Sequence, residues 1–109
     1  MYLKMTIVYY TIFMHFDGYW IVDSALADEV IADPERFRNL VTKAPTKLAA
    51  SRAALALGVA RGAKQLHLEG VGVSTSALTE MRRAGVVPVI LERGRRTDLT
   101  AGPDHSVVL

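Results

Sequence analysis

The order of apolar segments in residues 46–92 is the feature that most restricts the fold of this sequence. "TKLAASRAALALGVAR", residues 46–61, is dominated by Ala and Leu and predicts a helix that starts at Pro45-Thr46 and ends at Gly62. With so few polar residues, this helix is expected to pack on more than one side. "KQLHLEG", residues 64–70, then predicts a short strand.

A second helix and strand follow in the same alternating order. Residues 75–84 predict a helix, and Gly85 suits its left-handed C-terminal cap. "VVPVILE", residues 86–92, predicts the last clear strand, in which Pro88 indicates an edge or a bulged position. Strands joined by helices are expected to run parallel, with right-handed crossovers.

The chain begins with a different pattern, that of a β-hairpin. Residues 5–16 are rich in Tyr, Ile, Thr and Phe, and Asp17-Gly18 is a two-residue turn signal before a returning strand at residues 19–26. "ADPERFRNLV", residues 32–41, predicts a short helix, because Asp33 can cap it and Pro34 suits its first position.

Together these elements predict one α/β domain over residues 1–109. Its mixed sheet opens with an antiparallel hairpin, continues as α-β-α-β and carries helices on its faces. The tail after residue 92 has turn residues and little pattern. The apolar opening is too short for a membrane span and lacks the features of a signal peptide, so no membrane partner is expected.

Charge is distributed unevenly along the chain. The net charge of the 109 residues is only +2, but the segment from Lys43 onward contains ten Lys and Arg residues and only five Asp and Glu residues. The first 42 residues hold three basic and six acidic residues. Such asymmetry suggests a polyanionic partner for one face, and an ordinary solvated basic surface is the alternative.

The turn "GVGVSTS", residues 70–76, is the candidate for binding phosphate. Gly70 and Gly72 allow close backbone approach, while hydroxyls and free N–H groups at a helix start can receive phosphate oxygens. The turn lacks the Gly-Lys-Ser/Thr of a Walker loop and the third glycine of a dinucleotide fingerprint. An ordinary strand-to-helix turn, in which the hydroxyls only cap the helix, is the other interpretation. The candidate hydroxyl residues are Ser74, Thr75 and Ser76.

Basic side chains supply the remaining candidates for phosphate contacts. "RRAG" places two arginines in the last turn of the second helix, where they also suit the helix dipole. "ERGRR" places three arginines around a glycine after the last strand, which suits an RNA backbone or forms only an exposed loop. The basic candidates are Lys43, Lys47, Arg52, Arg82, Arg83, Arg93, Arg95 and Arg96.

Catalysis and metal binding find little support in the sequence. The chain has no cysteine, and His15, His67 and His105 lie far apart without ligand spacing. The carboxylates show no paired arrangement, and no Gly-x-Ser-x-Gly elbow is present. We therefore expect no enzyme activity, no cofactor and no small-molecule substrate.

The segments "YTIFMHFDGYWIVDSA" and "KAPTKLAASRAALALGVARGAKQLHLEGVGVSTSALTEMRRAGVVPVILERGRRTD" resemble the family of small-subunit ribosomal protein eleven, the platform protein. That family has a Thr-Ile strand with an Asp and Gly turn, an Ala-rich helix, a glycine turn, a helix with an Ala-Gly end and a Val-rich strand. The resemblance implies a ribonuclease-H-like sheet and a structural role in the small subunit. Its partners would be ribosomal RNA and neighbouring ribosomal proteins.

The sequence departs from that family at several points. Glu69 stands where the family's turn has a lysine, and residues 73–76 replace its arginine. The basic loop before the main helix becomes the acidic "ADEVIADPERFRN", which we expect to face protein or solvent, and the basic C-terminal extension is missing. These losses would suit a mitochondrial or other organellar ribosome, with a cytoplasmic one as the alternative.

Two other interpretations stay open. Large-subunit ribosomal protein eighteen has a similar helix-strand-turn-helix core and would also bind ribosomal RNA. A small α/β module that binds a nucleotide or another phosphorylated ligand would use the turn at residues 70–76. An enzyme on a ribonuclease-H-like sheet would need clustered carboxylates, whereas Asp17, Asp23 and Glu69 are scattered.

Overall fold

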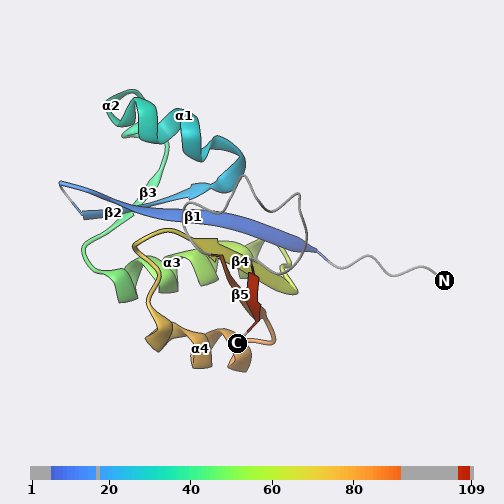
Figure 1. Cartoon of the computed structure of the whole chain (residues 1–109). Helices are drawn as coiled ribbons and strands as arrows, with labels where there is room; N and C mark the ends of the chain where they lie inside the picture. The colour runs from blue at the N-terminus through green and yellow to red at the C-terminus, as the bar shows by residue number, and fades with distance from the viewer. Residues whose placement is uncertain (1–5, 17, 92–105, 109) are drawn as a thin grey trace.

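The computed structural model describes residues 6–16, 18–91 and 106–108, and its centre is a six-stranded mixed sheet. The strand order is β3-β2-β1-β4-β5-β6, so the first strand of the chain lies in the middle. Helices cover both faces of this sheet (Figure 1). The predicted mixed α/β sheet is therefore confirmed.

The opening hairpin forms as predicted, although its second strand is shorter. β1 (Ile7–His15) and β2 (Gly18–Asp23) pair antiparallel. The predicted extension of β2 to residue 26 is wrong, because a 3₁₀ turn begins at Ser24. The side chain of Asp23 accepts a hydrogen bond from the Ala25 N–H at 3.0 Å, which turns the backbone away from the sheet.

The segment after the hairpin holds two helices where one was predicted, and then an unexpected strand. α1 (Ala27–Ala32) and α2 (Pro34–Phe37) are separated at Asp33, whose non-helical backbone and following proline interrupt the helix. The chain then returns to the sheet as β3 (Thr42–Ala44), antiparallel to β2. With only three residues, this strand lacked a detectable alternating pattern.

α3 (Lys47–Ala60) is the long helix predicted by the Ala-rich segment. Thr46 caps it, since its hydroxyl accepts a hydrogen bond from the Ala49 N–H at 3.1 Å. Its fully buried small residues include Ala50, Ser51 and Ala54. The helix contacts β1, β2 and β3 on the sheet and also the turn after β4, so it packs on two sides as expected.

The second half of the chain follows the predicted strand-helix-strand order. β4 (Gln65–Glu69) pairs parallel with β1, and β5 (Val87–Leu91) pairs parallel with β4. Between them lie a 3₁₀ turn (Thr75–Ala77) and α4 (Leu78–Arg83). The φ of +80° at Gly85 confirms the expected left-handed cap.

The last strand explains the position of Pro88. β6 (Ser106–Val108), which the sequence did not indicate, pairs antiparallel with β5 from Val89 onward. β5 is therefore not an edge strand, and the edge or bulged position predicted from Pro88 is wrong. Because the Val87 N–H bonds toward the β4 side, to the Lys64 carbonyl at 2.9 Å, the neighbouring Pro88 nitrogen faces the opposite side. The described pairing with β6 starts at the next residue, Val89.

Two hydrophobic cores lie on opposite faces of the sheet. α3 and α4 cover the larger one, which includes Val8, Ile12 and Leu66. α1 and α2 cover the smaller one, around Trp20 and Phe13, whose ring centroids are 5.7 Å apart. Figure 1 shows these helix pairs on opposite sides of β1. Trp20 is fully buried, as expected for a core residue.

Candidate nucleic-acid interface

The glycine turn after β4 makes its close approach to the protein's own β1. Gly70 has a φ of +109°, and a Cβ there would overlap the carbonyl oxygen of Ile12. A Cβ on Gly72 would overlap the Ile12 side chain and come within 3.0 Å of the Tyr19 ring. The Gly72 N–H also donates to the Ile12 carbonyl at 3.2 Å. Both glycines are thus required for packing, and their contact with RNA stays a prediction.

A buried serine of α3, which the sequence analysis did not single out, organises the same turn. Ser51 is 0% exposed, and its hydroxyl accepts a hydrogen bond from the Ser74 N–H at 2.8 Å. That hydroxyl in turn donates to the Gly72 carbonyl at 3.5 Å. The available signal was a lone hydroxyl among the alanines of residues 46–61. Ser51 thereby ties the turn to α3.

The hydroxyl residues of the turn differ in their surroundings. Thr75 and Ser76 are exposed, whereas Ser74 is partly buried and its side chain makes no capping hydrogen bond. The Ala77 N–H donates a hydrogen bond to the Ser74 carbonyl at 3.2 Å. Since several turn N–H groups already have acceptors within the protein, the exposed hydroxyls are the better candidates for an external ligand.

The basic candidates near α3 fall into two classes. Lys47, the first residue of α3, is exposed, and no carboxylate of the described residues pairs with it. Arg52 instead forms a forked ion pair with Glu80 of α4, with Nε–Oε1 and Nη2–Oε2 distances of 3.0 and 3.1 Å. Lys43 of β3 is exposed, but its ammonium lies 5.5 Å from the centroid of the Trp20 ring, which belongs to the core under α1 and α2 on the other face of the sheet.

The arginine candidates lie at the end of α4 and in the tail. Arg82 and Arg83 are both exposed in the last turn of α4, where cations suit the helix dipole. The cluster of Arg93, Arg95 and Arg96 lies outside the described residues. Its role in RNA binding stays a prediction from the sequence.

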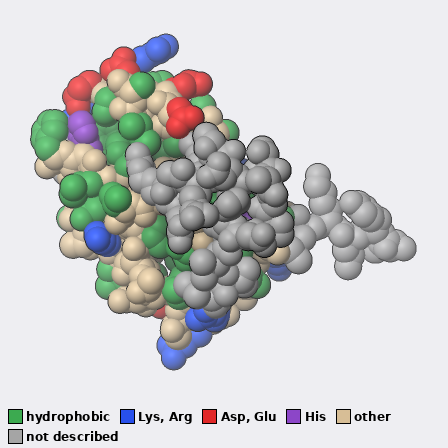
Figure 2. All heavy atoms as spheres, in the orientation of Figure 1, with side chains coloured by type: hydrophobic (Ala, Val, Ile, Leu, Met, Phe, Trp, Pro, Cys, Tyr) green, Lys and Arg blue, Asp and Glu red, His purple; other side chains and the backbone are tan. Residues whose placement is uncertain are grey.

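Acidic side chains gather on the other side of the sheet. Those of α1 and α2 lie at Asp28, Glu29 and Glu35, with Asp33 between the helices. Figure 2 shows red side chains over α1 and α2, while most of the visible blue lies over the part of the molecule formed by α3 and α4. The segment at residues 27–40 thus packs on the sheet through its apolar residues and exposes its charges, as an acidic surface should.

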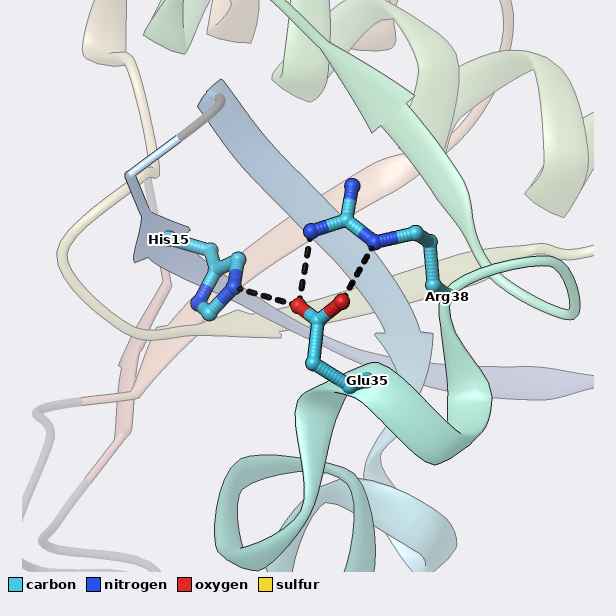
Figure 3. Close-up of polar contacts among 3 residues, drawn as sticks. All are labelled: His15, Glu35 and Arg38. Carbon is cyan, nitrogen blue, oxygen red and sulfur yellow. Dashed lines mark hydrogen bonds and ion pairs between the residues drawn. The ribbon is translucent and has the colours of Figure 1, made fainter.

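A polar cluster joins the end of β1 to α2. Figure 3 shows Glu35 between His15 and Arg38, with the His15 Nε2 at 3.2 Å and the Arg38 Nη2 at 2.7 Å from its Oε2. The Arg38 Nε donates to the other carboxylate oxygen at 2.9 Å. The hydrogen bonds from Arg38, and then that from His15, lower the pKa of Glu35 below its ordinary value, although desolvation opposes them. This cluster links α2 to the end of β1.

A second polar cluster is buried inside the sheet. Glu69 is only 4% exposed and accepts a hydrogen bond from the Thr11 hydroxyl at 2.8 Å, while Ser24 lies 2.9 Å from that hydroxyl. Burial lowers the pKa of His67, whose ring lies tilted against the Tyr9 ring at a centroid distance of 4.6 Å. Within the described residues, no group of three His, Asp or Glu side chains could hold a metal ion.

Comparison with protein-family models, with curated proteins and with solved structures finds no match. Within residues 6–16, 18–91 and 106–108, no helix is long and apolar enough to cross a membrane. The case for a function therefore depends on the surfaces described above.

Proposed function

We propose that this protein is a structural component of the ribosomal small subunit that binds ribosomal RNA in the platform region. The observation that carries the proposal is the separation of charge across the sheet. Exposed cations and hydroxyls occur along α3, the turn after β4 and α4, whereas carboxylates gather over α1 and α2 (Figure 2). A polyanion would bind the first surface and be repelled by the second.

The binding would rest on contacts with the RNA backbone. Lys47 and Arg83 are exposed cations, and Thr75 and Ser76 are exposed hydroxyls that can bond to phosphate oxygens or ribose. Such contacts position a protein on RNA and recognise mainly the shape of the nucleic acid. The role is structural, so no catalytic turnover is involved.

The order of elements supports a relation to the ribosomal protein eleven family. An antiparallel hairpin is followed by two strands that are parallel to β1 and are reached through α3 and α4. This is the order on which the resemblance rests, and a ribonuclease-H-like sheet is our proposal for the fold. The acidic α1 and α2 would face neighbouring ribosomal proteins or solvent, in an organellar ribosome or, alternatively, a cytoplasmic one.

Among the alternatives, a site for a small phosphorylated ligand loses support from the turn itself. The space beside Gly70 and Gly72 is filled by Ile12, and the Ser74 N–H already bonds to Ser51. A large-subunit protein similar to ribosomal protein eighteen would use the same basic surface. Only the subunit with which the protein associates separates these two ribosomal roles.

RNA affinity measured across a salt series tests the proposed surface. Lys47→Ala and Arg83→Ala should each reduce the slope of log affinity against log salt by just under about one unit on duplex RNA, and by about 0.7 on a single strand. Arg36→Ala is the matched control, because Arg36 is exposed on the acidic α2. Equal slopes for all three variants and the parent chain would contradict the proposed surface.

A further inference from the structure

The turn end of the β1–β2 hairpin carries large apolar side chains that are mostly exposed. Phe16 is 87% exposed and Met14 is 64% exposed, which are high values for such large apolar side chains. They lie at an open hollow of about 750 Å³ that we call the hairpin hollow. Its lining residues are Met14, His15, Phe16, Gly18, Tyr19 and Pro45.

The hairpin hollow adjoins the proposed RNA surface. Tyr19 belongs to its lining and also packs beside Gly72 of the turn. On another side, Pro45 lies two residues before Lys47, the exposed first residue of α3. A nucleic acid on the basic surface could therefore extend into the hollow without crossing the acidic helices.

One cation lies beside an aromatic ring of the hairpin hollow. The Arg38 guanidinium lies 5.9 Å from the centroid of the Phe16 ring. The neighbouring carboxylate, Glu35, is already engaged by Arg38 and His15 (Figure 3). Asp17, which follows Phe16 in the sequence, lies outside the described residues.

We infer that the hairpin hollow binds an unpaired base of single-stranded RNA, which stacks on Phe16 while its phosphates lie toward Lys47. This inference rests on the proposed function and specifies which form of RNA the surface takes. Exposed aromatic rings beside a basic track are the means by which proteins hold unpaired nucleotides, because every base offers a face for stacking. A purely apolar protein partner would gain nothing from Lys47, which follows two residues after Pro45 of the hollow.

The test measures binding of the full chain to three labelled probes: a uridine decamer, a decamer of the same backbone without bases, and a fully paired RNA duplex. Phe16→Ala should weaken binding of the uridine decamer roughly 5- to 150-fold, the range typical of one lost base–aromatic stack. Phe16→Tyr, which keeps the ring, should bind as the parent chain does. Leu40→Ala is the control, since Leu40 is 78% exposed but lies outside the hollow.

The outcomes separate this inference from the proposed function. A loss of affinity confined to the uridine decamer, with an unchanged salt slope and an unchanged melting temperature, supports a stacked base. If Phe16→Ala binds all three probes like the parent chain while Lys47→Ala still flattens the salt slope, the proposed function stands and the inference is overturned. The hollow would then be left to a protein partner. Failure of the parent chain to bind any probe would overturn both.

Discussion

Ile12 is the residue around which the turn after β4 is built. It is 0% exposed at the centre of β1, and its carbonyl oxygen accepts the hydrogen bond from the Gly72 N–H. The backbones of Gly70 and Gly72 lie so close to it that neither position has room for a Cβ. The conformation of this turn is therefore determined by contacts inside the protein.

Gly70→Ala should cost about 2–5 kcal/mol in the free energy of unfolding. A positive φ is unfavourable for alanine by about 1–2 kcal/mol, and forced overlap in a packed core adds about 1–3 kcal/mol. Gly85→Ala is the control, because Gly85 also has a positive φ but has no atom within 4 Å of the added Cβ. Urea unfolding measures both, and equal losses would show that Ile12 does not confine the turn.

Ser51→Ala should cost about 1–3 kcal/mol, because it removes the acceptor of the Ser74 N–H from the interior. The exposed Ser76→Ala should stay within about 0.5 kcal/mol of the parent chain. Hydrogen exchange of the Ser74 amide gives a second readout, which should become faster in the Ser51 variant alone. Unchanged exchange would mean that Ser51 does not support the turn.

At the scale of elements, α2 is attached to the hairpin by its polar cluster as well as by packing. Glu35 joins Arg38 of the following segment to His15 at the end of β1 (Figure 3). Its pKa in the folded protein is lowered chiefly by the hydrogen bonds from Arg38. A lowered pKa contributes stability that is present above the ordinary value of 4.5 and is lost as the pH falls through the folded value.

Glu35→Gln should therefore destabilise the protein near neutral pH and have a diminishing effect as the pH falls below about 4.5. The measurement is the urea midpoint of both chains between pH 7 and pH 3, given as a difference at each pH. Glu29→Gln on the exposed face of α1 controls for the general loss of a negative charge. A difference that is independent of pH would show that the cluster does not hold α2.

The elements that the sequence predicted well are those with long or regular patterns. Local sequence pattern and tertiary packing agree for the Ala-rich α3, for the hairpin with its turn signal at Asp17-Gly18, and for the apolar β4 and β5. β3 and β6 have three residues each and depend on pairing with distant neighbours, so no local pattern reveals them. β3 pairs with the edge of β2, and β6 pairs with the edge of β5.

The candidate site was predictable only in part, for a similar reason. Exposure of Lys47, Arg82 and Arg83 follows from charge and helix position. The pairing of Arg52 with Glu80 joins residues 28 apart in the sequence, and only the packing of α3 against the turn and α4 brings them together. The role of the two glycines in the turn could not be predicted from their spacing. A bound ligand and a neighbouring strand both require a backbone position without a side chain, so both favour glycine.

At the scale of the whole molecule, the sheet divides an acidic side from a basic one. The acidic α1 and α2 cover the smaller core around Trp20, and the basic surface of α3 and α4 covers the larger core around Ile12. The acidic surface and the basic surface thus face in opposite directions (Figures 1 and 2). Such a division suits the proposed ribonucleoprotein role, in which one side meets RNA and the other meets protein or solvent.

The position of the native protein in a density gradient of cell or organelle extract tests the central claim most directly. At low salt and with magnesium present, the account predicts that the protein sediments with the small ribosomal subunit. High salt should release it, because its contacts with RNA phosphates depend on counterion release. Sedimentation as a small free species at low salt would contradict a ribosomal role, and sedimentation with the large subunit alone would contradict the assignment to the small subunit.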